Sequence, residues 1–212
     1  CAMAVKMKIE TLSKCAGFFI LIAISQLLFF SVLAIPLMKI ENIMPVLGNG
    51  IQPVISGAFS AFTFPFGETV IFTAVLSYLQ PEKSTYKVYL TSLLIAGFFI
   101  IIVAMRNAMV LGADDLAAVY FPSYSVLSRI NVGDFLQRLE IAVSMVFILS
   151  GFVKISICLM VSCKGLAKLL GYDDYRFLVI PVALLMINLS YIIYENTMEM
   201  FEWAFNIYPY YA

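Results

Sequence analysis

Residues 51–79 form an apolar stretch that is longer than one membrane span and is interrupted near its centre by Pro65 and Gly67. A membrane span needs about 20 apolar helical residues. Proline removes a backbone donor and clashes with the preceding helical turn, and glycine adopts conformations that other residues avoid. We therefore predict a helix that unwinds from Thr63 to Gly67 and leaves backbone amides and carbonyls without helical partners.

Unpaired backbone at membrane depth is tolerated only where protein covers it or where it lines a polar cavity. Discontinuous helices of this kind build substrate and ion sites in secondary transporters. The leading hypothesis is therefore a ligand-binding site at the interruption, formed by Thr63, Phe64, Pro65, Phe66, Gly67 and Glu68.

The composition indicates an all-α integral membrane protein, because 63% of the residues are hydrophobic, 12% are charged and the mean hydropathy is +0.99. Thirteen basic and thirteen acidic residues balance without a basic run, which argues against a nucleic-acid partner. We predict a single membrane domain, with short interfacial helices in the connection over residues 112–140. The five spans are expected at about 17–37, 51–79 (broken at 63–67), 88–110, 141–163 and 177–194.

Lysine and arginine are distributed unevenly between the two ends of these spans. Eight of them fall on one side, namely Lys6, Lys8, Lys14, Lys83, Lys87, Lys164, Lys168 and Arg176, and three on the other, namely Lys39, Arg129 and Arg138. Because cytoplasmic loops are enriched in these residues, the first side is predicted to be cytoplasmic. The aromatic and acidic tail, residues 195–211, then lies outside and suits a membrane surface.

Three charged residues fall within predicted spans, where an ionisable group is costly and is a candidate functional residue. Glu68 follows the interruption directly, so it either caps the second half-helix or accepts a proton or an ammonium group of a ligand. Lys154 in the fourth span either snorkels toward the cytoplasmic interface or faces the protein interior as a fixed intramembrane cation. Arg106, near the outer end of the third span, is expected to snorkel or to form an interfacial ion pair.

The sequence shows no sign of an enzyme, because it lacks histidine, a nucleophile elbow and a phosphate-binding loop. No catalytic residue, metal or cofactor is predicted. Cys1, Cys15, Cys158 and Cys163 are expected to be small buried thiols, with a redox pair of Cys158 and Cys163 as the alternative.

Four segments carry a resemblance to a known family: LGNGIQPVISGAFSAFTFPFGETVIFTAVLSYL, FPSYSVLSRINVGDFLQRLE, GFVKISI and GYDDYRFLVIPVALL. In this order they resemble the endospore germination permeases, the B subunits of nutrient germinant receptors in the amino acid, polyamine and organocation superfamily. The resemblance implies ten spans in two inverted five-helix repeats. The chain, which begins at Cys1 and shows no signal peptide, is then expected to be a fragment that holds the fifth to ninth spans.

The resemblance also implies a function and partners. A membrane subunit of this kind senses an amino acid or similar small nutrient at the sixth-helix interruption and triggers germination together with A and C subunits. Lys154 would lie on the eighth helix, where its ammonium stands in for the cation of sodium-coupled relatives. The expected location is the lipid bilayer of the bacterial cell membrane or inner spore membrane. Two other functions stay open: a proton- or cation-independent amino-acid permease, and a structural membrane subunit without a ligand.

Overall fold

The computed structural model describes residues 1–7, 9–45, 47–48, 50–76, 78, 84–130 and 139–211, and throughout these ranges the regular structure is helical. The end of the predicted second span at Leu79, and the positions of Lys8, Lys83 and Arg138, lie outside the described residues. Within the described residues five helices are long and apolar enough to cross a membrane: Ile9–Leu37, Gln52–Leu76, Thr85–Leu111, Ile141–Leu169 and Arg176–Ile193. The expectation of an all-α membrane protein is confirmed.

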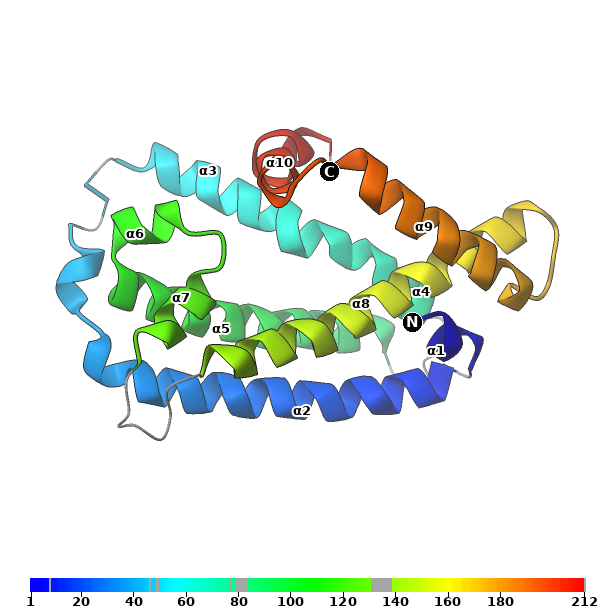
Figure 1. The fold of residues 1–212 in the computed structure, drawn as a ribbon, viewed down its shortest axis with the longest axis horizontal. Coiled ribbons are helices and arrows are strands. Elements are labelled where there is room, and N and C mark those ends of the chain that lie inside the picture. Colours follow the sequence, from blue (N-terminus) through cyan, green and yellow to red (C-terminus); the bar gives the residue numbers. More distant parts are fainter. Residues whose placement is uncertain are drawn as a thin grey trace. The chain divides into compact units, whose positions relative to one another are not determined.

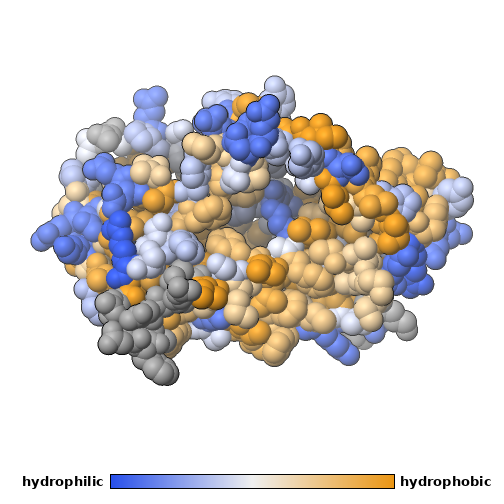
Figure 2. Space-filling view, in the orientation of Figure 1, coloured by the Kyte–Doolittle hydropathy of each residue, from blue (hydrophilic) through white to orange (hydrophobic). Residues whose placement is uncertain are grey.

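Large apolar side chains are exposed along all five helices, and Figure 2 shows broad hydrophobic areas over α8 (Glu140–Leu169) and α9 (Val179–Ile193). A soluble protein would bury much of this surface, whereas lipid tails cover it at no cost. These exposed faces are therefore expected to face lipid.

The chain divides into two compact units, and each is described by itself. Unit 1 comprises Cys1–Cys15, Asn49–Tyr78 and Phe152–Ala212. Its elements are α1 (Ala2–Lys6), the start of α2 (Ile9–Ala34), α3 (Gln52–Ala61), η3 (Phe62–Phe66), η4 (Gly67–Phe72), α4 (Thr73–Leu76), the second part of α8, η5 (Arg176–Leu178), α9, α10 (Thr197–Glu202), η6 (Trp203–Ile207) and η7 (Tyr208–Tyr210) (Figure 1).

The core of unit 1 joins the N-terminal residues to α8 and α9. Val5 of α1 is buried against Leu159 and Met160 of α8 and Val179 of α9. The Tyr175 hydroxyl, in the turn between α8 and α9, donates a hydrogen bond to the Val5 carbonyl oxygen at 3.2 Å. This packing ties segments together that are more than 150 residues apart in the sequence.

Unit 2 comprises Ala16–Gly48 and Leu79–Gly151. It contains most of α2, η1 (Ile35–Leu37), η2 (Ile40–Ile43), α5 (Thr85–Leu111), α6 (Ala113–Ala118), α7 (Pro122–Ser128) and the first part of α8. The α6 and α7 helices are the short helices predicted in the third connection, of which residues 131–138 lie outside the described ranges. Whether the two units form the single membrane domain predicted from the sequence stays a prediction.

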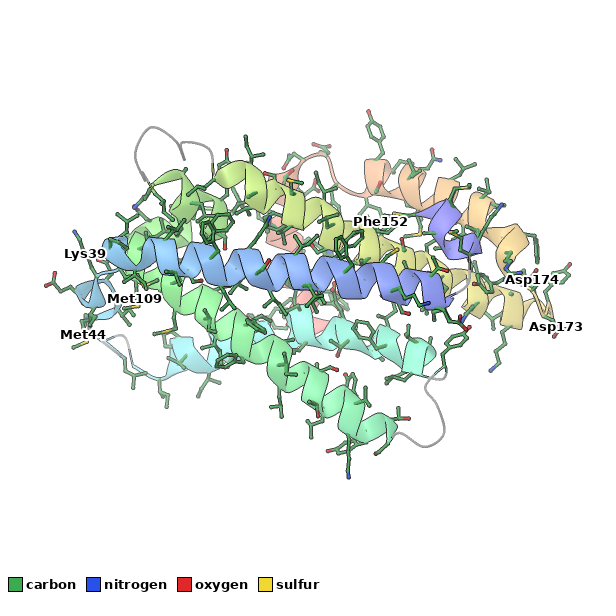
Figure 3. All side chains as sticks on the ribbon, turned by 90° about the horizontal axis from the view of Figure 1, so that it is seen from below. Lys39, Met44, Met109, Phe152, Asp173 and Asp174 are labelled. Carbon is green, nitrogen blue, oxygen red and sulfur yellow. The ribbon has the colours of Figure 1, made fainter. Side chains whose placement is uncertain are left out.

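Backbone and side-chain hydrogen bonds fasten the turn after α2 to the end of α5. The Lys39 amide donates to the Met109 carbonyl oxygen at 3.0 Å, and the Asn42 side-chain amide donates to the same oxygen at 2.8 Å (Figure 3). Gly112 then ends α5 at a φ of +79°, a conformation that L side chains rarely adopt. A glycine is therefore required here for the chain to leave α5 and enter α6.

Candidate functional site at the interrupted helix

The interruption of the second membrane helix is centred on Phe64. This residue has φ −133° and ψ 119°, an extended conformation inside η3, the π-helical segment that joins α3 to the 3₁₀-helix η4. Its sequence cause is Pro65, because a proline disfavours the helical conformation of the residue before it and offers no amide of its own. The helical path is thus broken at one residue, and helical φ and ψ resume on both sides.

Two threonine hydroxyls near Phe64 donate hydrogen bonds to backbone carbonyls around the break. Thr63 donates to the Ser60 carbonyl oxygen at 2.9 Å, and Thr69 donates to the Phe66 carbonyl oxygen at 2.5 Å. Thr63 is only 4% exposed. Its hydroxyl therefore stabilises the backbone rather than facing open space.

Gly67 differs from the sequence-based expectation. Its φ of −61° and ψ of −33° are ordinary right-handed helical values, and a Cβ placed there would meet only the Phe62 carbonyl oxygen, at 3.6 Å. The structure thus needs no glycine at this position, and the expected glycine-dependent unwinding at Gly67 is wrong. The break depends on Pro65 and on the extended Phe64.

Glu68 and Lys154 form an ion pair, with Lys154 Nζ 2.5 Å from Glu68 Oε2. The same ammonium lies over the Phe64 ring at 5.4 Å from its centroid, within the range of a cation–π interaction. The Lys154 side chain is 57% exposed and that of Glu68 35% exposed in this chain. The interruption thus gathers a carboxylate, an ammonium and an aromatic face from two helices far apart in the sequence.

This geometry bears on the alternative interpretations of both charges. Among the described residues, the Glu68 carboxylate accepts its hydrogen bond from Lys154 and from no backbone amide, so it does not act as a helix cap through a side-chain bond. Lys154 extends toward Glu68 rather than toward a helix end. Pairing also lowers the cost of two charges at membrane depth. A ligand role for either residue stays a prediction.

The remaining predicted site residues differ in exposure. Pro65 and Gly67 are exposed and Phe66 is half-buried. No group of three or more His, Cys, Asp or Glu side chains in the described part of the chain is placed to hold a metal ion. Phe64, Glu68 and Lys154 are the predicted residues that the structure brings together.

The sequence reasoning missed one neighbour of the interruption, the C-terminal segment η7. This segment contacts η3, and Pro209 within it is buried. Trp203 and Tyr208 pack with ring centroids 5.5 Å apart and hold the tail in a compact turn. The aromatic content of the tail was its only sequence signal, and that signal equally suits a membrane surface.

Two further expectations are corrected. Cys1 and Cys15 are exposed rather than buried, whereas Cys163 is buried and Cys158 partly so, and all four are free thiols. Arg106 neither snorkels nor forms an interfacial ion pair among the described residues, because its side chain is only 4% exposed and hydrogen-bonds to Asn107 and Ser123.

Comparison with known proteins places this geometry in context. Residues 1–198 match the spore permease family, whose description is spore germination protein. The chain is 31% identical to spore germination protein KB of Bacillus subtilis (strain 168) over 172 residues, which cover 81% of the chain and 46% of that protein. It is 23% identical to the putative spore germination protein YfkT of the same strain over 194 residues, 91% of the chain and 52% of that protein. No solved structure matches the chain.

The chain thus spans about half the length of both curated relatives. The match to the family together with five apolar helices identifies a multi-pass membrane protein.

Proposed function

The chain belongs to the spore germination protein family, and from this premise we propose that it forms part of the membrane subunit of a nutrient germinant receptor. Its ligand is a free amino acid or a similar small nutrient, which binds at the interrupted helix. Binding triggers germination through A and C subunits in the inner spore membrane. The observation that carries the proposal is the Glu68–Lys154 ion pair beside the extended Phe64.

A zwitterionic amino acid complements this pair. Its ammonium group can pair with the Glu68 carboxylate, and its carboxylate can pair with the Lys154 ammonium. Both protein charges are already near each other, so a ligand that carries both charges can replace the internal pair without leaving either group unpaired. A ligand with a single charge would leave one protein charge without a partner.

The backbone next to the pair provides a second element of recognition. The extended Phe64 places a main-chain segment outside the helical hydrogen-bonding pattern, as in transporters whose broken helices bind substrate through freed backbone groups. The Phe64 ring, 37% exposed, offers an aromatic surface beside the ammonium of Lys154. Side-chain selection among nutrients would involve this ring.

A ligand that displaces the ion pair would also produce a signal. The pair links the broken helix to α8, so its opening changes the contact between two membrane helices. A ligand shifts a conformational equilibrium only by its difference in affinity for the two states. The proposed trigger is therefore that the nutrient binds more tightly to the state in which Glu68 and Lys154 are apart. The A and C subunits respond to this state.

The test is equilibrium binding of radiolabelled amino acids to the purified full-length protein, with Glu68→Gln and Lys154→Met as variants. We expect each variant to lose at least about tenfold in affinity, because removing one partner of a charged contact costs well over 1.4 kcal/mol. Lys87→Met, at an exposed lysine near the start of α5, is the matched control and should bind normally.

Unchanged affinity in both site variants would refute the interruption as the ligand site. Accumulation of labelled amino acid in vesicles that hold the full-length protein would indicate a permease instead. A folded full-length protein that binds no nutrient, alone or assembled with A and C subunits, would indicate a structural subunit.

A further inference from the structure

Unit 2 contains a partly open cavity of about 540 Å³ that takes no part in the proposed ligand site. It lies between α2, α5, α7 and α8, and its wall is built mainly from apolar side chains, among them Ile24, Phe30, Phe99 and Val146. This volume falls within the range of small-molecule sites in proteins. The charged side chain in its lining is Arg106 of α5.

Arg106 is held in position by two neutral neighbours. Its Nε and Nη2 atoms donate to Asn107 Oδ1 at 3.2 and 2.9 Å, and Nη2 also donates to Ser123 Oγ at 2.9 Å. The Asn107 side-chain amide donates to the same Ser123 oxygen at 3.2 Å. The guanidinium is thus fixed at the α5–α7 contact by hydrogen bonds along one edge, from Nε and Nη2.

This arrangement leaves donors without acceptors. Ser123 Oγ accepts two hydrogen bonds, so its own proton is available for donation, and Arg106 Nη1 donates to no described residue. A guanidinium carries five N–H donors and stays charged in proteins. The polar end of the cavity therefore presents a hydroxyl donor and an arginine nitrogen to whatever occupies it.

The charge of Arg106 has no counter-charge in the described part of the chain. Its side chain is 4% exposed, and no carboxylate there lies within ion-pair distance of it. A buried, unpaired charge within a membrane span is strongly unfavourable. The other arginine of this unit in the described ranges, Arg129, is exposed and pairs with Asp115 at 2.6 Å. Arg106 thus differs from an ordinary structural arginine by lacking an anion.

We propose that this cavity is a second binding site, which takes a small carboxylate with an apolar body and no ammonium group. The carboxylate accepts hydrogen bonds from Arg106 Nη1 and the Ser123 hydroxyl, in the geometry that favours arginine for carboxylate recognition. The apolar body lies along the wall formed by α2 and α8. The ligand neutralises the buried charge and occupies the part of the cavity next to Arg106.

The lining also predicts selectivity against amino acids. The described residues that line the cavity include no acidic side chain, so the ammonium group of a zwitterion would meet only neutral acceptors such as Gln26 and no counter-charge. A monocarboxylate brings a single charge that matches the single charge of Arg106. The second site thus differs in ligand class from the Glu68–Lys154 site, where both charges are present.

The test uses purified full-length protein and three probes of similar shape: 4-methylpentanoate, L-leucine and 4-methylpentanol. Binding is measured by calorimetry for the unaltered protein and for Arg106→Gln, Arg106→Lys and Ser123→Ala. We expect 4-methylpentanoate to bind and Arg106→Gln to weaken it at least about 30-fold. Arg129→Gln is the matched control, the same substitution at an exposed arginine, and should bind normally.

Because Arg106→Gln also removes hydrogen bonds within unit 2, its helix content and gel-filtration profile are compared with those of the unaltered protein. Ser123→Ala and Arg106→Lys, which change less, should weaken 4-methylpentanoate binding while folding normally. Glu68→Gln should leave 4-methylpentanoate binding unchanged. The experiment can therefore refute this proposal without refuting the proposed function, and the reverse. Unchanged 4-methylpentanoate binding in folded Arg106→Gln, equally strong binding of 4-methylpentanol at this site, or no binding to the unaltered full-length protein would each overturn the proposal.

Discussion

A double-mutant cycle on Glu68 and Lys154 tests whether the ion pair at the interruption contributes to stability as the structure indicates. At the observed 2.5 Å separation, the gross attraction of two unit charges is about 7 kcal/mol at an effective dielectric constant of about 20 and about 2 kcal/mol in water. Desolvation and the partial exposure of both side chains offset most of it. We expect a net coupling free energy of about 1 to 2 kcal/mol.

The sign of the cycle is as informative as its size. Glu68→Gln leaves the Lys154 ammonium without a carboxylate, and Lys154→Met leaves the carboxylate without a cation. The double variant Glu68→Gln/Lys154→Met leaves no charge at all. Because an unpaired charge costs more than a neutral pair, the double variant should be more stable than the sum of the two single losses predicts.

The assay is reversible unfolding of the full-length protein in mixed micelles, followed by circular dichroism as the fraction of denaturing detergent rises. The four proteins are compared at the same detergent composition and pH. If the losses of the single variants add in the double variant to within about 0.5 kcal/mol, the two residues do not interact in the folded protein. The structural basis of the proposed site would then be wrong.

Three more predictions concern the backbone of both units and the core of unit 1. Gly67→Ala should change the free energy of unfolding by less than about 1 kcal/mol, whereas Gly112→Ala, at a φ of +79°, should cost about 1 to 2 kcal/mol in the same unfolding assay. Equal losses would contradict the assigned conformations. Pro65→Ala should straighten the helix, which is measured as a longer distance between spin labels on either side of the break, and it should also weaken nutrient binding. An unchanged distance would show that Pro65 does not cause the break. Tyr175→Phe should cost about 0.5 to 1.5 kcal/mol through the lost bond to Val5. Burial raises the pKa of Tyr175, so the folded protein holds the phenol proton more tightly than the unfolded chain. The contribution of Tyr175 to the free energy of unfolding is complete below about pH 10 and decreases as the pH rises further. Tyr175→Phe should not show this decrease.

The interruption was predictable because its cause is local. Pro65 restricts Phe64 through a steric clash between neighbouring residues, and this clash exists in any fold. The role of Gly67 was not predictable in the same way. A glycine permits unusual backbone angles without requiring them, and here the chain adopts ordinary helical ones.

The environment of the charged side chains depended on packing between distant segments. Arg106 and Lys154 are each the one cation within their predicted spans, 88–110 and 141–163, and their sequence surroundings suggest snorkelling for either one. In the structure Arg106 is enclosed by Asn107 and Ser123, whereas Lys154 reaches Glu68. Which partner a long side chain meets is decided by the neighbouring helix, which a single segment of sequence does not specify.

The sequence by itself determined that the protein is helical and membrane-embedded, because a hydrocarbon environment forces long apolar segments to satisfy their backbone as helices. It also determined where the second helix breaks, through the local stereochemistry of Pro65. Only the tertiary structure decided that Glu68 meets Lys154, that η7 contacts η3, and that Arg106 lines a cavity without a described counter-charge. Those outcomes depend on contacts between residues far apart in the chain, whose free energies arise only when the helices pack.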